Sequence, residues 1–400
     1  MTEVSRITAA FIILLVQLFT VPGAKAAELT GSAAVEGRFF FHPPLHAGQK
    51  YHDSSLALTA EYYREFSMGS SVTVVPFARL DSADPQRTHA DFRELNFIYP
   101  GEGWEATAGI AKVFWGATEF VHLVDIINQT DLVEDLDGEE KLGQPMLRLS
   151  LVRDWGVIDG YLLPLFRERT FPGKKGRPRS SVVVDTDQAV YESGVGQYHP
   201  DFALHYSHTF GACDLGVAQF FGTSREPSLL ETTPAAGATR LFPFYPRIAQ
   251  TGVYLQMVRG EWLWKGEALY RSGQGRDFFA TTFGFEYTLH GVPESSMDLG
   301  ILGEYIFDDR DETIATVFDH DVMIGLRWAA NDAAGTEALA GIIKDLNHSS
   351  ISATLEASRR FGETMKLRLS GYVFADPDEN EQLFSLAQDD FVRLEAIYYF

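Results

Sequence analysis

The sequence has almost no cysteine, and after its first residues it has no long apolar segment. Cys213 is the only cysteine among the 400 residues, so the chain cannot form an internal disulfide. We expect Cys213 to be a small apolar residue on a strand. Beyond residues 9–21, no segment approaches the 18 consecutive apolar residues that indicate a transmembrane helix. These absences favour a protein without helical membrane spans.

Positive charge is scarce as well, with 33 Lys and Arg against 55 Asp and Glu and a net charge of −22. Such acidity argues against nucleic acid as a partner. The Gly-x-Ser-x-Gly and His-Glu-x-x-His motifs of common hydrolases are missing. His205, Ser207 and His208 lie together in "LHYSHTF", and we expect this cluster to be structural. The sequence therefore predicts neither an enzyme nor a resident cofactor.

The first 26 residues have the pattern of a secretory signal peptide. Arg6 precedes the apolar stretch 9–21, and the small-residue pattern Ala24-Lys25-Ala26 follows it. The apolar stretch is shorter than a membrane-spanning helix requires. We therefore expect cleavage after Ala26, export of the chain, and one domain over residues 27–400.

From residue 31 onward, the chain divides into runs in which apolar and polar side chains alternate at period two. In "EWLWKGEALYR", Trp262, Trp264 and Tyr270 alternate with charged residues such as Lys265 and Glu267. Serial runs of this kind are typical of transmembrane β-strands, which place apolar side chains toward lipid and polar side chains inward. A secreted two-sheet sandwich is the soluble alternative.

Short connections alternate with longer, more polar ones along these runs. Turns are predicted at "SMGS", "PGEG", "RDWG", "TFGAC", "VRGE", "GVPESS", "NDAAG" and "FGE". They predict an all-β, antiparallel up-and-down barrel of eighteen strands, with sixteen as the alternative because one pair depends on the brief connector "DLNHSS". Aromatic residues near strand ends favour the barrel over the sandwich: Phe41, Tyr62, Tyr99, Trp262, Tyr270, Trp328, Tyr398 and Phe400.

The last residues, "LEAIYYF", resemble the C-terminal strand signal of Gram-negative outer-membrane proteins, which ends in Phe with apolar or aromatic residues at alternate positions before it. This resemblance implies that Tyr398 and Phe400 belong to the signal read by the barrel-assembly machinery. It also implies a location in the bacterial outer membrane, among its lipids and lipopolysaccharide.

A second stretch, from Lys112 to Pro145, resembles the Trp-Gly and Asn-x-x-Asp segment of porin-like families, including the DUF1302-type and alginate-export-like barrels. The stretch contains the third predicted outer loop. In general porins this loop folds into the lumen, so the resemblance implies that residues 116–143 form the constriction. Val121, Val124 and Ile127 have helical spacing and predict a short amphipathic turn against the inner wall.

The charges of this loop and of the strands supply the candidate site residues. For the constriction we expect Asp125, Asn128, Asp131, Glu134, Asp135, Asp137, Glu139 and Glu140. For the basic lumen wall, strand parity gives Arg38, Arg148, Lys265, Arg271, Arg327, Arg360, Lys366, Arg368 and Arg393. The alternatives are a solvated surface loop, ion pairs that fill the wall, and calcium binding at "DLDGEE", which lacks the full spacing of a calcium loop.

The fourth predicted loop contains a basic island, "RERTFPGKKGRPR", on an otherwise acidic chain. It could attract anionic solutes or bind lipopolysaccharide phosphates, or it could be a solvated loop. Taken together, the patterns predict a porin-like channel for passive diffusion of small hydrophilic, charged solutes, either as a single chain or as a homo-oligomer. An outer-membrane lipid or glycan hydrolase and a plugged adhesion or structural barrel are the alternatives.

Overall fold

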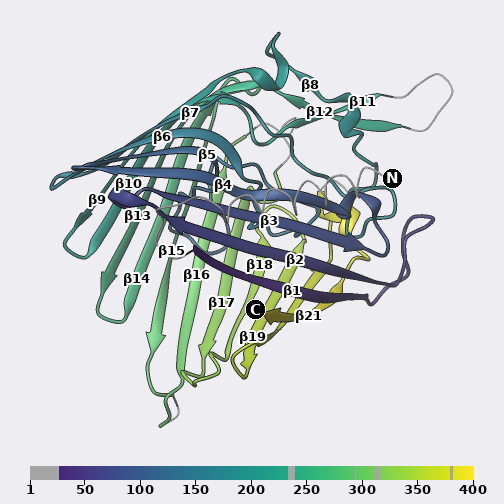
Figure 1. Ribbon diagram of the computed structural model, residues 1–400. Helices are drawn as coiled ribbons and strands as arrows, with labels where there is room; N and C mark the ends of the chain where they lie inside the picture. The colour runs from purple at the N-terminus through teal and green to yellow at the C-terminus, as the bar shows by residue number, and fades with distance from the viewer. Residues whose placement is uncertain (1–26, 233–238, 293, 311–315, 379–381) are drawn as a thin grey trace.

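A computed structural model describes residues 27–232, 239–292, 294–310, 316–378 and 382–400 of the chain. Eighteen antiparallel strands form one sheet that closes on itself (Figure 1). The expected signal peptide, residues 1–26, lies outside the described residues. Within the described ranges, no helix is long and apolar enough to cross a membrane.

The barrel strands follow one another around the sheet in chain order. They are β1 (Ala27–Phe40), β2 (His52–Glu65), β3 (Ser71–Asp81), β4 (His89–Gly101), β5 (Trp104–Ala111), β6 (Gln144–Arg153), β7 (Gly156–Leu163), β9 (Asp201–Phe210), β10 (Cys213–Thr223), β13 (Arg247–Arg259), β14 (Trp262–Ser272), β15 (Phe278–Leu289), β16 (Asp298–Asp308), β17 (His320–Ala329), β18 (Glu337–Asp345), β19 (Ile351–Phe361), β20 (Met365–Ala375) and β21 (Phe391–Tyr399). Short 3-10 helices lie between some of them: η1 (Ser67–Gly69), η2 (Pro85–Arg87), η3 (Thr186–Gln188), η4 (Gly196–Tyr198) and η5 (Gln382–Leu386).

Three further strands form a small separate sheet above one end of the barrel (Figure 1). They are β8 (Val190–Tyr191), β11 (Ser228–Thr232) and β12 (Arg240–Tyr245). β12 pairs antiparallel with β11 and parallel with β8. The sheet thus joins the long connections that precede β9 and β13.

The barrel closes where the first and last strands pair. β1 and β21 are antiparallel, with Ser32 opposite Tyr399 and Phe40 opposite Phe391. Beyond this ladder, Gly31 and Phe400 exchange two backbone hydrogen bonds of 2.9 and 3.0 Å. Closure satisfies the edge groups that an open sheet would leave unpaired.

Alternation along each strand separates an apolar outer face from a polar inner one. On β1, Val35 and Phe39 are 60% and 53% exposed, whereas Glu36 and Arg38 are 2% and 5% exposed. On β21, Leu394 is exposed while Arg393 and Glu395 are buried. Because successive strand side chains point to opposite faces, the charged residues line the interior and the apolar ones cover the outside.

The eight predicted turns are confirmed, and all lie at one end of the barrel, which we call the turn end. The other end, the loop end, carries the longer connections. The third loop (residues 112–143) joins β5 to β6, the fourth (164–200) joins β7 to β9, and the fifth (224–246) joins β10 to β13. The alternative of sixteen strands is wrong, because β18 and β19 form a regular pair around residues 346–350.

Candidate functional site

The third loop contacts inward-facing side chains on strands that are not neighbours in the sheet. Its Glu119 forms ion pairs with Lys265 on β14 and Arg327 on β17, at 2.9 and 2.6 Å. Its later residues contact β3, β4, β20 and β21, as described below. One loop therefore connects distant parts of the inner wall.

Two buried carboxylates of the wall hold the first part of this loop. Glu267 on β14 accepts hydrogen bonds from the backbone N–H groups of Ala117, Thr118 and Val124, at 2.7, 3.1 and 3.1 Å. Glu304 on β16 accepts from the N–H groups of residues 119 and 120, at 2.7 and 3.2 Å. Hydrogen bonds from N–H groups to carboxylates are stronger than those to neutral acceptors.

The helical turn predicted from Val121, Val124 and Ile127 is wrong, since the third loop contains no helix. A helix needs its N–H groups to bond carbonyls four residues earlier, and here carboxylates of the wall take several of these groups. Val124 and Ile127 are nevertheless buried, and Val121 is half-buried. Val124 and Ile127 pack with Trp115, whereas Val121 packs against Ile306 and Met323.

The middle of the loop shares an apolar cluster with one side of the inner wall. Val124, Ile126 and Ile127 pack among inward-facing residues of β6, β7, β9, β10 and β13 that include Tyr161 and Phe220. Ile127 is completely buried. This side of the interior is therefore filled by packed side chains.

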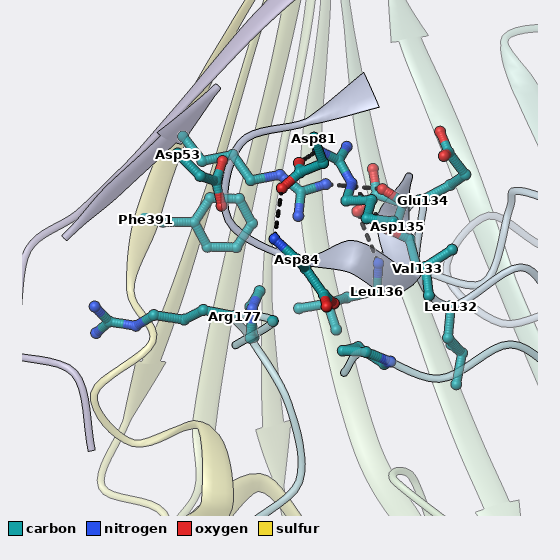
Figure 2. A pocket seen from close by; sticks show the side chains of 15 residues that line it. Asp53, Asp81, Asp84, Leu132, Val133, Glu134, Asp135, Leu136, Arg177 and Phe391 are labelled. Carbon is teal, nitrogen blue, oxygen red and sulfur yellow. Dashed lines mark hydrogen bonds and ion pairs between the residues drawn. The ribbon is translucent and has the colours of Figure 1, made fainter. Parts of the chain in front are cut away.

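The tip of the loop carries three predicted acids, and each has an arginine partner. Asp131 pairs with Arg93 on β4 at 2.7 Å. Glu134 pairs with Arg79 on β3 at 2.8 Å, and Asp135 pairs with Arg393 on β21. Figure 2 shows Glu134 and Asp135 gathered near Asp53 and Asp81 of the wall strands and Arg177 of the fourth loop.

The other predicted loop residues divide into structural and exposed groups. Asn128 bonds the backbone at Ala111, Val113 and Leu142, which ties the two ends of the loop together. Asp125 pairs with Lys141 at 3.3 Å. Asp137, Glu139 and Glu140 each expose part of their surface, and Glu139 pairs with His122 at 2.9 Å.

The pKa values of several titratable groups of the loop are shifted, and His122 and Asp137 are two of them. Burial lowers the pKa of His122, but the Glu139 carboxylate at 2.9 Å and the Glu267 carboxylate at 3.9 Å outweigh it and raise the value to about 10. Burial and the neighbouring Asp135 raise the pKa of Asp137 to about 7. His122 is therefore a cation at neutral pH, while Asp137 changes charge near neutrality.

Eight of the nine predicted wall cations form ion pairs within the described part of the chain. The pairs are Arg38 with Glu36, Arg148 with Glu105, Lys265 with Glu119, Arg271 with Glu226, Arg327 with Glu119 and Glu286, Lys366 with Glu337, Arg368 with Glu395, and Arg393 with Asp135. Arg360 instead lies over the Tyr399 ring, 5.3 Å from its centroid. The alternative of paired charges that fill the wall thus describes most of this set.

A cavity of about 340 Å³ lies inside the barrel against β1 to β4, β20, β21 and both ends of the third loop. Lys112, Glu94 and Glu140 contribute charged groups to its lining. The alternating strand pattern could not identify Lys112 as a residue of the interior, because Lys112 lies one residue beyond the end of β5. Parity places Glu267 and Glu304 on the inner face, but no pattern shows that they bind the loop backbone.

The basic island of the fourth loop is mostly directed into the protein. The Arg177 guanidinium is buried, pairs with Asp389, and donates to the carbonyls of His42 and Gln388. Arg167 pairs with Asp91, and Arg169 donates to Gln129. These contacts fasten the fourth loop to its neighbours and leave few of its cations for an external ligand.

His205 has structural partners, and the described residues form no metal site. His205 is buried, stacks on Trp115, and makes hydrogen-bond contacts with Asp159 and Tyr254 at 3.4 and 3.1 Å. Ser207 belongs to the same strand but makes no contact with His205 that would resemble a nucleophile and its base. Among the described residues, no group of three or more His, Cys, Asp or Glu is arranged to hold a metal ion.

The fold has counterparts among solved structures. A BenF-like porin from Pseudomonas fluorescens Pf-5 matches with a TM-score of 0.55 at 11% identity, over 94% of this chain and 98% of the other. Pseudomonas aeruginosa OpdQ matches with a TM-score of 0.54 at 11% identity, over 95% and 99%. OccK3 (OpdO) from the same organism matches with a TM-score of 0.53 at 11% identity, over 93% and 96%.

No family model and no curated protein matches the chain. The narrower resemblance to DUF1302-type and alginate-export-like barrels therefore stays a prediction. At 11% identity, the solved structures establish the architecture alone. The chain folds as a closed eighteen-stranded barrel of the kind found in these porins.

Proposed function

We propose that the protein is an outer-membrane channel of porin type that passes small hydrophilic, charged solutes by passive diffusion. The observation that carries this proposal is the closed eighteen-stranded barrel with charged residues inside and apolar residues outside. An outward apolar surface matches lipid, and barrels of 16 to 18 strands are wide enough for an aqueous channel. The likeness to solved porins supports the same function.

The third loop is the proposed constriction. Its contacts with β14 and β17 at one side and with β3, β4 and β21 at the other support a path across the interior. Exposed Asp137, Glu139 and Glu140 would then face the remaining opening, whereas wall residues such as Arg327 and Arg368 are paired with carboxylates. Charged groups at a narrow point select solutes by the sign of their charge.

The location implies partners in addition to solutes. Phe400 continues the pairing of β21 with β1, and we propose that Tyr398 and Phe400 also serve as the signal for the barrel-assembly machinery. The apolar outer face would contact membrane lipid and lipopolysaccharide, or a second copy of the chain. Calcium binding at "DLDGEE" stays a prediction of the sequence, and Asp135 of that stretch is bound to Arg393.

The test is the conductance of the refolded protein in planar bilayers, compared with a variant that lacks residues 121–140. We expect a larger single-channel conductance and altered ion selectivity, because the deletion removes the loop that narrows the opening. Removal of residues 229–244, at the small sheet outside the barrel, is the matched control and should leave conductance nearly unchanged.

Two outcomes would contradict the proposal at different points. A wild-type barrel that inserts but never conducts would exclude a channel. If the barrel conducts and the deletion of 121–140 has no effect, the third loop is external to the pathway. An unboiled-gel mobility shift shows beforehand that each variant is folded.

A further inference from the structure

The cavity beside the two ends of the third loop contains four basic and four acidic side chains. The net charge that a passing ion encounters depends on which of these side chains are paired with one another. A guanidinium already paired with a carboxylate adds little net charge to its surroundings, whereas an unpaired group acts with its full charge.

Three of the four basic groups are paired. Arg79 bonds the Glu134 carboxylate through Nε at 3.0 and 2.9 Å. Arg93 pairs with Asp131 at 2.7 Å, and Arg368 pairs with Glu395 at 3.1 Å. These pairs hold the loop to the wall, or one strand to the next, and their charges largely cancel.

Lys112 is different, because its ammonium group has no ion pair or hydrogen bond among the described residues. It is exposed and lies one residue after the end of β5. The Glu140 side chain, near the other end of the loop, is likewise exposed and has no bonded partner in the described structure. Glu94 on β4 accepts one hydrogen bond, from the neutral amide of Asn96 at 3.0 Å.

We infer that Lys112, Glu94 and Glu140 supply the charge by which this cavity contributes to the selectivity of the channel, and that the arginines of the same cavity are structural. This inference rests on the proposed function. One ammonium group against two carboxylates leaves a net negative cavity that favours cations, and Lys112 is the group that admits anions. The geometry thus assigns the uncompensated charge of this cavity to three residues rather than to the more numerous arginines.

The experiment is the reversal potential of single channels across a KCl gradient, with about 0.1 M salt on the dilute side so that charges act over ~10 Å. The wild type should prefer K⁺ over Cl⁻. Lys112→Met removes a positive charge and should raise the ratio of K⁺ to Cl⁻ permeability about threefold. The change is modest because the high dielectric constant of water in the pore weakens the effect of one unit charge. The double variant Glu94→Gln, Glu140→Gln should shift the preference in the opposite direction, toward Cl⁻.

Two controls separate unpaired from paired charge. Lys112→Arg keeps the charge and should leave the reversal potential where it is in the wild type. The double variant Arg368→Met, Glu395→Gln removes a complete ion pair and should not shift the potential either. Because the Lys112 ammonium group has no hydrogen bond or ion pair in the described structure, its replacement breaks neither, and gel mobility confirms that each barrel is folded.

An unchanged reversal potential in Lys112→Met would overturn the inference. A shift in the paired-residue variant as large as that in Glu94→Gln, Glu140→Gln would overturn it as well. Both results presuppose a conducting wild type. A wild type that does not conduct would instead contradict the proposed function, so the two failures are distinguishable.

Discussion

Arg393 illustrates how the position of a charged residue differs from its role. Strand parity places it on the inner wall, where an unpaired guanidinium would attract anions. In the folded chain it pairs with Asp135 of the third loop and donates to the Ser370 hydroxyl at 3.0 Å. Separating such a buried pair is costly because each charge would be left without its partner. Arg393 therefore fixes the loop and contributes little net charge to the interior.

Asp137 is the residue whose charge should depend on pH near neutrality. Its carboxylate and that of Asp135 both contact the Tyr372 hydroxyl, at 3.2 Å, although the hydroxyl can donate only one hydrogen. Arg393 is bonded to Asp135, and Glu139 adds negative charge on the same loop. The arrangement favours a proton on Asp137, in agreement with its pKa of about 7.

We therefore predict that the preference for cations increases between about pH 6 and pH 8. As the pH rises through 7, Asp137 loses its proton and the opening gains one negative charge. Reversal potentials measured across this range provide the test. Asp137→Asn should remove most of the change, and a pH dependence that persists in this variant would assign it to another group.

At the scale of elements, the third loop is held by carboxylates of the wall rather than by its own secondary structure. Glu267 accepts three backbone N–H groups of this loop and the Thr118 hydroxyl. We predict that Glu267→Leu loosens residues 117–124 and makes the single-channel current noisier. Each lost charge-assisted hydrogen bond costs roughly 1.5–3 kcal/mol.

Glu286→Leu is the matched control for this prediction. Glu286 also faces inward and pairs with Arg327, but it accepts no backbone N–H of the third loop. Its replacement removes an equal charge and should leave the current quiet. Equal noise in both variants would mean that lost charge, and not the lost backbone contacts, disturbs the loop.

The same elements show how far the sequence alone could lead. Period-two alternation indicated the barrel strands, and the count of eight short turns predicted eighteen of them, because lipid-like outer and polar inner environments impose a local pattern on every strand. The third loop has no such constraint. Its conformation depends on Glu267 and Glu304, which lie far away in sequence, and helical spacing at Val121 and Val124 was therefore misleading.

The pairing of wall charges was unpredictable for a related reason. Parity assigns Arg79, Arg93 and Arg393 to a face, but their partners come from a loop whose path the pattern does not specify. Lys112 lies outside the alternating strand patterns. It matters because no described residue forms an ion pair or hydrogen bond with its ammonium group. Sequence therefore predicts the strands of the barrel wall better than it predicts which charged side chains are unpaired at the opening.

For the whole molecule, closure of the barrel depends on the contact between its two ends. The Phe400 ring lies over Gly31, where an added Cβ would be 2.7 Å from the ring and 2.9 Å from the Thr59 carbonyl oxygen. Only the absence of a side chain at Gly31 lets the ring pack there. The ring can then cover the junction between β1 and β21 while the backbones of Gly31 and Phe400 exchange hydrogen bonds.

We predict that Gly31→Val destabilises the closed barrel by about 1–3 kcal/mol, the usual effect of overpacking. Its midpoint of thermal unfolding, followed by the mobility of unboiled samples on gels, should fall below that of the wild type. Gly160→Val is the matched control, because Gly160 is also on a barrel strand and has open space where a Cβ would lie. Since valine suits strands, this control should remain as stable as the wild type. If both variants lose stability equally, the cause is a general effect of replacing strand glycines. The junction between β1 and β21 is then no more sensitive to an added side chain than other parts of the barrel.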